Sequence, residues 1–235
     1  MHEEEEKTYK LFYYWLVTSL ILVFFIIIVG GLTRLTNSGL SITEWELFRG
    51  IIPPLNNDSW IMYFDLYKKI PQYNLLNFDM TINEFKFIFY WEYFHRILAR
   101  IIGLFFLIPL IYFHFSNKII KNLKAFYVIL FLIILQGIIG WYMVKSGLTN
   151  DVTVSHYRLS VHLGMAIIII SIIFWQILSI KNNSYRNFFK ISFKNISYFL
   201  LIALLFLQIM SGALVSGLDA GRIYQTWPLM GENFF

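Results

Sequence analysis

The sequence contains no cysteine, which excludes structural disulfides, thiolate metal sites and cysteine nucleophiles. Charged side chains are also scarce, at 14% of residues, and only 5 prolines interrupt the chain. What remains is apolar, because 58% of the residues are hydrophobic and 20% are aromatic, well above the share in a soluble domain. This composition is typical of an integral membrane protein. The net charge of +5 lies in short connections rather than in one basic stripe, so we expect lipid head groups and no nucleic acid as partners.

Five apolar stretches are long enough, at about 20 residues each, to cross the hydrocarbon core as helices. They cover residues 11–32, 93–115, 123–144, 157–180 and 196–217. The sequence therefore predicts an all-α polytopic membrane protein with a four-helix transmembrane bundle in residues 11–180. The first stretch follows the acidic segment HEEEEK and shows no small-residue cleavage site, so we interpret it as a retained span.

Basic residues gather at one set of span ends, which predicts the orientation in the membrane. They are Lys7, Lys10, Lys118, Lys121, Lys124, Lys181, Arg186, Lys190 and Lys194. By the positive-inside rule these ends face the cytoplasm, with residues 1–10 as a cytoplasmic tail. Residues 33–91 then lie on the outer side, where their many tryptophans and tyrosines favour an interfacial segment, partly amphipathic helix, that covers a site.

An internal repeat links the outer ends of the first and fifth spans. The stretches GGLTRLTNSGLSITEW and GALVSGLDAGRIYQTW match without a gap. The matched pairs are Gly30 and Gly212, Leu32 and Leu214, Gly39 and Gly221, and Trp45 and Trp227, with Asn37 opposite Asp219. We therefore expect residues 196–235 to be the start of a second, repeated half, and the chain to be partial because three further spans would complete that half.

Two histidines form the main candidate metal site. His95 and His162 each lie about one turn below the outer mouth, on spans that run in the same direction. Two imidazoles at one depth suit the axial positions of a haem. The small side chains of Ala99, Gly103 and Ala166 on the same helices leave room beside them. Zinc is a weaker interpretation because it needs more ligands, and two interfacial histidines hydrogen-bonded to neighbours remain an alternative.

Four arginines at the same mouth are candidate partners for haem propionates: Arg34, Arg96, Arg100 and Arg158. Guanidinium groups bind carboxylates well, although lipid phosphate is an equal alternative for Arg34 and Arg158. Arg100 lies about 12 Å along the helix from Glu92. An ionised side chain at that depth costs about 2.5–3.5 kcal/mol, so we expect an anionic partner or a water cavity for it.

Glu92 is the candidate catalytic residue, one turn before His95 on the same helix face. Near a haem edge a carboxylate can accept protons, orient water or stabilise a cation on the substrate. It is equally consistent with a carboxylate at a helix N-terminus that the helix dipole favours.

Several stretches taken together resemble one known family. GGLTRLTNSGLSITEW, IPPLN, FKFIFYWEYFHRILAR, VSHYRLSVHLGMA and SGALVSGLDAGRIYQTWPLMGENF are similar to the heme A synthase family in its mitochondrial and alphaproteobacterial branch, over nearly the whole chain. The resemblance implies eight helices in two related halves, each with a histidine pair able to hold a haem. It also implies oxidation of a ring methyl of heme O to the formyl group of heme A, the prosthetic group of cytochrome c oxidase, in a bacterial inner membrane.

Carried onto this sequence, the resemblance places His95 and His162 as the amino-terminal pair that receives heme O, and Glu92 as the associated carboxylate. The half expected to hold haem b lies outside this chain, so we expect the fragment to be inactive alone. Expected partners are heme O synthase, cytochrome c oxidase assembly factors and a second copy of the chain. His156 carries no role, and the lack of cysteine excludes the thiol chemistry of relatives with cysteine pairs.

Two other classes of function stay open on the residues alone. A bis-histidine cytochrome would move electrons without making a product. A non-haem transporter would use Glu92, Arg96 and Arg100 along a polar path, with Gln136 and Gln208 contributing from neighbouring spans.

Overall fold

The computed structural model describes residues 2–45, 49–115, 123–182, 194–223, 226 and 229–233. The long helices are α1 (His2–Leu35), α4 (Ile82–Phe115), α5 (Lys124–Asn150), α6 (His156–Lys181) and α7 (Ile196–Gly217). The short ones are η1 (Arg49–Ile51), α2 (Asn57–Tyr67), α3 (Pro71–Leu76) and α8 (Ala220–Ile223). Apart from an isolated bridge between Met230 and Asn233, the described residues form no β-structure, so the predicted all-α class is confirmed. Lys118, Lys121, Arg186, Lys190 and Trp227 lie outside the described residues.

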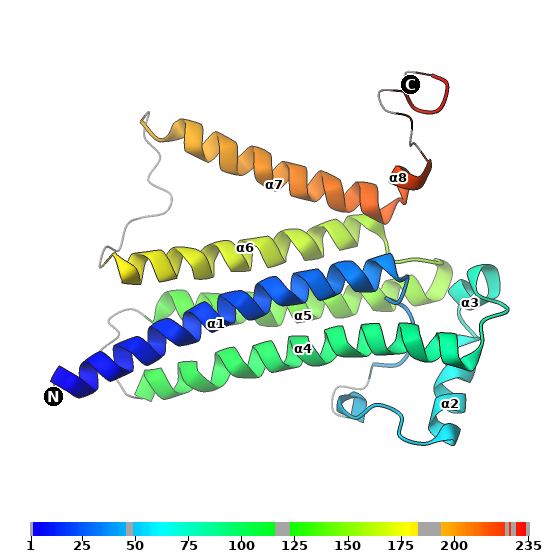
Figure 1. Cartoon of the computed structure of the whole chain (residues 1–235), viewed down its shortest axis with the longest axis horizontal. Coiled ribbons are helices and arrows are strands. Elements are labelled where there is room, and N and C mark those ends of the chain that lie inside the picture. Colours follow the sequence, from blue (N-terminus) through cyan, green and yellow to red (C-terminus); the bar gives the residue numbers. More distant parts are fainter. Residues whose placement is uncertain are drawn as a thin grey trace.

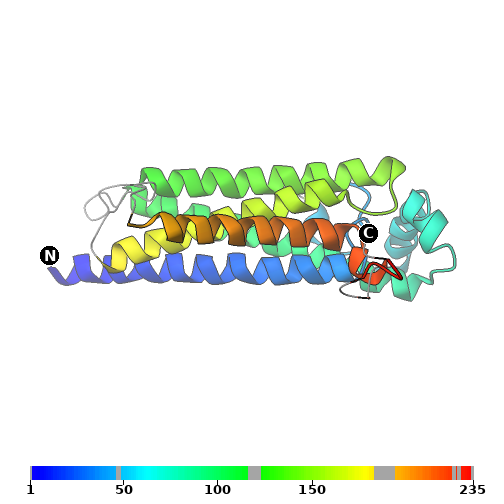
Figure 2. The same ribbon diagram turned by 90° about the horizontal axis from the view of Figure 1, so that it is seen from above.

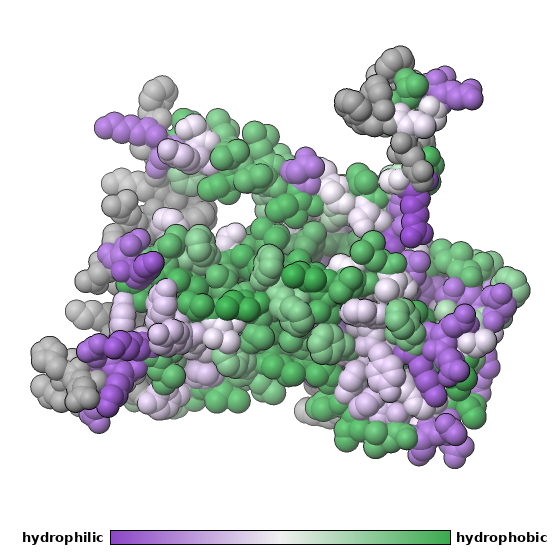
Figure 3. Space-filling view, viewed as in Figure 1, coloured by the Kyte–Doolittle hydropathy of each residue, from purple (hydrophilic) through white to green (hydrophobic). Residues whose placement is uncertain are grey.

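Among the described residues, five helices are long and apolar enough to cross a membrane: α1, α4, α5, α6 and α7. Figure 3 shows apolar side chains over the middle of the molecule, with hydrophilic residues concentrated towards its two ends. This distribution matches a hydrocarbon layer between two polar interfaces. The chain is therefore a multi-pass membrane protein, as the sequence predicts.

Four of these helices form a bundle. Helix α1 packs against α4 and α6, and α5 packs against the same two helices, so α4 and α6 lie on one diagonal and run in the same direction (Figure 1). Helix α7 packs against α6 along the side of the bundle. Seen from above, the long helices lie roughly parallel (Figure 2). This arrangement agrees with the predicted four-helix bundle followed by one further helix.

Two helices begin earlier than the apolar stretches suggest. Helix α4 begins at Ile82 rather than at residue 93, because Thr81 and Glu84 form a capping box: the Thr81 amide donates to Glu84 Oε2 at 2.8 Å, and the Glu84 amide donates to Thr81 Oγ1 at 3.4 Å. Helix α1 includes most of the predicted cytoplasmic tail, where Glu6 and Lys10 form an i,i+4 ion pair at 2.6 Å.

The outer segment contains the amphipathic helix α2. Its buried residues Trp60, Phe64 and Tyr67 lie on one face and belong to a cluster that includes Phe85 and Phe89 of α4. Asn56 caps the helix, since its Oδ1 accepts from the Ser59 amide at 2.8 Å. The outer segment is thereby fixed to the extension of α4, at the end of the bundle where α1 ends (Figure 1).

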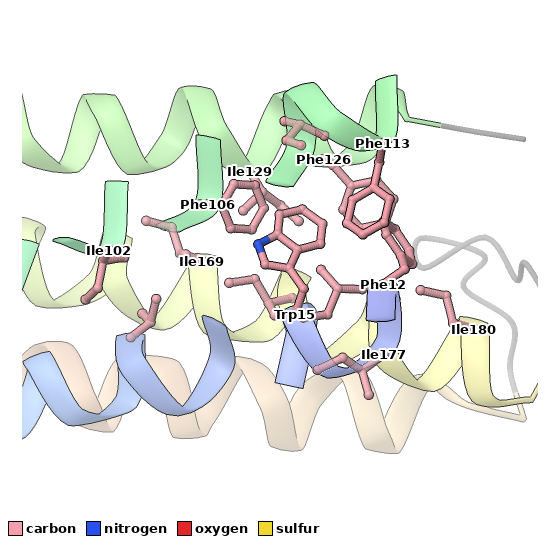
Figure 4. Packing of buried hydrophobic residues seen from close by; sticks show 14 of the residues in the cluster. Phe12, Trp15, Ile102, Phe106, Phe113, Phe126, Ile129, Ile169, Ile177 and Ile180 are labelled. Atoms are coloured by element: carbon pink, nitrogen blue, oxygen red, sulfur yellow. The ribbon is translucent and has the colours of Figure 1, made fainter. Parts of the chain in front are cut away.

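The core near the opposite end centres on Trp15 of α1, which Figure 4 shows among the rings of Phe12, Phe106 and Phe113. The Trp15 indole donates to the carbonyl of Phe105 at 3.0 Å. That carbonyl lies four residues before Pro109, and proline has no N–H to complete the helical bond. Trp15 therefore supplies the hydrogen bond that the proline removes from α4.

Candidate functional site

Glu92 lies inside α4 and is buried, with 3% of its surface exposed. Its Oε2 accepts hydrogen bonds from the Ser41 hydroxyl at 2.7 Å and from the Ile42 amide at 2.8 Å. Its Oε1 lies 2.5 Å from Arg96 Nη2, one turn further along the helix. The same Nη2 donates to the Ile42 carbonyl at 3.1 Å. Three donors thus hold the carboxylate in one orientation, which is what an acceptor-only group needs when it is taken out of water.

The alternative that Glu92 is a carboxylate at a helix N-terminus is wrong. Helix α4 begins at Ile82, and the acidic residue in its first turn is Glu84. The effect of the helix dipole is confined to the first turn, so it does not account for Glu92. Its position depends instead on the chain after α1, whose buried residues Ser38, Leu40 and Ser41 fold back over α4.

His95 packs against a glycine of the neighbouring helix. A Cβ on Gly30 of α1 would lie 3.1 Å from Cε1 and 3.6 Å from Nδ1 of His95. The Nδ1 atom is buried and has no hydrogen-bond partner among the described residues. The ring therefore occupies space that exists because position 30 has no side chain.

His162 has the same surroundings on the other side of the bundle. A Cβ on Gly140 of α5 would lie 2.9 Å from Cε1 of His162, and the Nδ1 of this ring is likewise buried without a partner in the described structure. In both pairs, α1 with α4 and α5 with α6, the first helix supplies the glycine and the second the histidine.

The donor set fits the axial positions of a haem better than a zinc site. No group of three or more histidine, cysteine or acidic side chains comes together within the described residues, whereas zinc takes three or four such ligands. Two buried imidazoles on helices that run in the same direction are a donor set that the iron of a haem takes. His95 and His162 are the residues that would hold its iron.

The four candidate arginines have different surroundings. Arg34 donates to the Ser216 carbonyl at 2.6 Å and pairs with Asp219 at 3.0 Å, so its guanidinium joins α1 to the turn after α7. Arg158 donates to the Ser146 hydroxyl and lies over the Tyr142 ring, 4.9 Å from its centroid.

The other two arginines lie on α4. Arg96 is tied to Glu92 and lies over the Trp45 ring at 5.4 Å, and Arg100 lies one turn further along the same helix. The binding of propionates by the four arginines stays a prediction. Two of them are already paired with carboxylates, Arg34 with Asp219 and Arg96 with Glu92.

His156 lies apart from this pair. A Cβ on Gly217, the last residue of α7, would meet His156 Cβ at 2.6 Å, so this histidine belongs to the contact between α6 and α7.

Comparison with known proteins identifies the family. Residues 13–235 match the family COX15-CtaA, described as cytochrome oxidase assembly protein. The chain belongs to this family. Proteins named heme A synthase are similar to it: the one from Pelagibacter ubique is 52% identical over 216 residues and the one from Rickettsia canadensis is 47% identical over 210 residues. No solved structure shows a significant match.

The match covers a larger share of this chain than of these relatives. The match covers 88% of this chain and 61% of the Pelagibacter protein, and 88% and 60% for the heme A synthase of Parvibaculum lavamentivorans. The chain thus spans less than two thirds of the length of these relatives.

Sequence reasoning missed several residues that hold the site. Gly30 stood out only as part of the repeat, and Gly140 was not singled out. Ser41 and Ile42 carry no recognisable motif, because a hydroxyl and a main-chain amide become ligands of a carboxylate only through the path of the chain. The usable signal was the spacing of glycines on the helices next to each histidine.

Proposed function

We propose that this chain provides the heme O site of a heme A synthase, in which a ring methyl of heme O is oxidised to the formyl group of heme A. The observation that carries the proposal is the buried carboxylate of Glu92, one turn from His95, which accepts hydrogen bonds from three donors. The glycine-backed histidine pair and the similarity to proteins named heme A synthase support it.

The roles of the haem iron and of the protein side chains follow from the chemistry of the reaction. A methyl C–H bond has no acidity that a side chain can exploit, so the oxidation is chemistry that a redox-active haem iron would supply when bound. His95 and His162 would bind and orient the macrocycle. The segment from Ser38 to Ile42 covers Glu92 and excludes water from its carboxylate.

Glu92 acts through its negative charge at a fixed point. Because Ser41, Ile42 and Arg96 already donate to its oxygens, the carboxylate is held as an acceptor. A preorganised charge of this kind stabilises positive charge that develops on the substrate without reorienting during the reaction. Of the roles open from the sequence, stabilisation of a cation therefore suits this geometry better than proton shuttling.

The orientation in a bacterial inner membrane is part of the same proposal. Of the basic residues that predict the orientation, Lys7, Lys10, Lys124, Lys181 and Lys194 are described. They belong to or adjoin the helix ends on the side of the bundle where α1 begins (Figure 1). The positive-inside rule then places the N-terminus in the cytoplasm and the Glu92 site near the outer surface. Heme O synthase and factors of cytochrome oxidase assembly are the partners that this activity requires.

The test is pigment extraction. Cells that make heme O but no heme A express this chain joined to the part of the Pelagibacter ubique relative that it does not match, and extracted haems are identified by mass spectrometry. Heme A is expected for the wild type and should be lost in Glu92→Gln. Glu84→Gln, an exposed change on the same helix, is the control. Haem b without heme A in the wild type would instead indicate an electron-transfer cytochrome.

A further inference from the structure

Among the described residues, Gln136 of α5 uses only one of its two polar atoms in a hydrogen bond at the histidine site. Its Nε2 donates to the main-chain carbonyl of His162 at 3.0 Å. Its Oε1 is buried and accepts no hydrogen bond within the described structure. The Gln136 amide N–H thus binds the main chain of His162. The Gln136 amide oxygen lies beside the same residue and has no partner in the described structure.

The unpartnered acceptor is costly unless something else binds it. A buried amide oxygen that lacks a donor loses its hydration without compensation. Gln136 lies on the same face of α5 as Gly140, one turn away, and Gly140 is the residue that backs the His162 ring. The free oxygen therefore belongs to the same helix face that forms the wall of the histidine site.

The position along the helix indicates which part of a bound molecule reaches this oxygen. Helix α5 runs towards the end of the bundle that carries the outer segment (Figure 1), so Gln136 is about 6 Å further from that end than Gly140. Arg158, one turn before His162, lies on the opposite side, towards the outer end. Charged groups of a ligand suit the arginine side, and an uncharged hydroxyl suits the amide oxygen.

We propose that Gln136 is a specificity-determining residue whose Oε1 accepts a hydrogen bond from a hydroxyl group on the apolar side chain of the substrate. This inference rests on the proposed function. Heme O carries such a hydroxyl on the carbon next to the ring, where haem b has a vinyl group with no donor. The structure thereby assigns to Gln136 the distinction between a hydroxyalkyl porphyrin and a vinyl porphyrin, because a site built to bond a hydroxyl rejects the analogue that lacks it.

The experiment compares two haems and two variants. The purified 235-residue chain in detergent is titrated with heme O and with haem b, and dissociation constants are taken from the Soret band. In Gln136→Met the ratio of heme O affinity to haem b affinity should fall about tenfold. Gln136→Met also loses the bond to the His162 carbonyl, but that loss affects both haems equally and cancels in the ratio.

Gln208→Met is the matched control, because Gln208 also lies four residues before a glycine on a spanning helix but is exposed on α7. Its affinity ratio should equal that of the wild type. A Gln136→Met protein that binds both haems with the wild-type ratio would overturn the assignment to Gln136 alone. A wild-type chain that binds neither haem would overturn the proposed function and this inference with it.

Discussion

Asn37 and Asp219 adopt the same left-handed backbone conformation at the ends of α1 and α7, with φ of 52° and 51°. Arg34 binds both of their side chains, through Nη1 to Asn37 Oδ1 at 3.1 Å and through Nη2 to Asp219 Oδ1 at 3.0 Å. Short side chains with a carbonyl or carboxylate tolerate this conformation better than most other residues. One arginine thus joins two equivalent turns that lie far apart in the sequence.

The backbone around the two turns repeats as well. The hydrogen bond from the Thr36 amide to the Leu32 carbonyl has its counterpart from Leu218 to Leu214, each at 3.0 Å. Arg34 itself corresponds to Ser216, 182 positions later, and donates to the carbonyl of that residue. The helix ends therefore share their geometry, although only one of them supplies the arginine that joins them.

Replacing Arg34 should loosen the turn after α7 without unfolding the bundle. Asp219 is 46% exposed on its side chain, so the ion pair contributes less than about 1 kcal/mol to the free energy of unfolding. In Arg34→Gln we expect faster proteolytic cleavage after Gly217 and a nearly unchanged unfolding temperature in detergent. Lys68→Gln, which removes the exposed pair with Asp65, should leave the cleavage rate unaltered.

Gly140→Ala should displace the His162 ring. The added Cβ would lie 2.9 Å from Cε1 of the imidazole, closer than carbon atoms tolerate, and overpacking of this kind costs about 1–3 kcal/mol. We expect haem affinity, followed by Soret titration, to fall about tenfold or more. Gly137→Ala on the same helix meets nothing within 4 Å and should bind haem as the wild type does.

A matched pair of glycine substitutions also tests the packing of His95. Gly30→Ala places a Cβ 3.1 Å from His95 Cε1, whereas Gly31→Ala meets nothing within 4 Å. Gly30→Ala should weaken haem binding and Gly31→Ala should not. Equal affinities in the two variants would show that the His95 ring does not need this space.

Trp15 and Pro109 should prove energetically coupled. Trp15→Phe leaves the Phe105 carbonyl without its donor, which should lower the free energy of unfolding by about 1–3 kcal/mol. In a Pro109→Ala background the same substitution should cost less, because alanine restores the helical N–H. Denaturation in mixed micelles, followed by circular dichroism, is measured for the wild type, the two single variants and the double variant. Strictly additive effects on the free energy of unfolding would contradict the coupling.

Tyr67 should make the outer segment sensitive to alkaline pH. Burial raises the pKa of its phenol, although the hydrogen bond from Asn77 acts in the opposite direction. The folded state therefore favours the neutral phenol, so its stability is intact below the ordinary tyrosine pKa of about 10 and falls as the pH rises through the higher value.

Tyr67→Phe should abolish this alkaline loss. At neutral pH it should cost about 1 kcal/mol, because Gln72 and Asn77 lose a partner at 2.9 Å and 2.7 Å. Limited proteolysis of the outer segment between neutral and alkaline pH measures both effects. If the cleavage rate of the variant rises with alkaline pH as it does in the wild type, the titrating group is not Tyr67.

Hydrophobicity alone was sufficient to predict the spanning helices, because an apolar run of about 20 residues satisfies its backbone hydrogen bonds within a bilayer as an α-helix. The start of α4 was missed since its first turns cross the polar boundary, where Thr81 and Glu84 decide the helix end and hydropathy does not. The capping box TINE is visible in the sequence and would have placed Glu92 inside the helix.

The contacts across helices were beyond a reading of the sequence. Nothing near Arg34 marks Asp219 as its partner, and the small residues expected to flank His95, Ala99 and Gly103, lie on its own helix. The glycine that contacts the ring belongs to α1. Such contacts depend on how the helices rotate against one another, which is set by packing over their whole length.

One of the three bonds that hold Glu92 comes from the main-chain amide of Ile42. No ordinary side-chain replacement at that position deletes the donor, and among the coded amino acids only proline lacks it. Alanine substitution at position 42 would therefore leave this support of the carboxylate in place, whereas a proline there should remove a neutral donor from a buried charged acceptor.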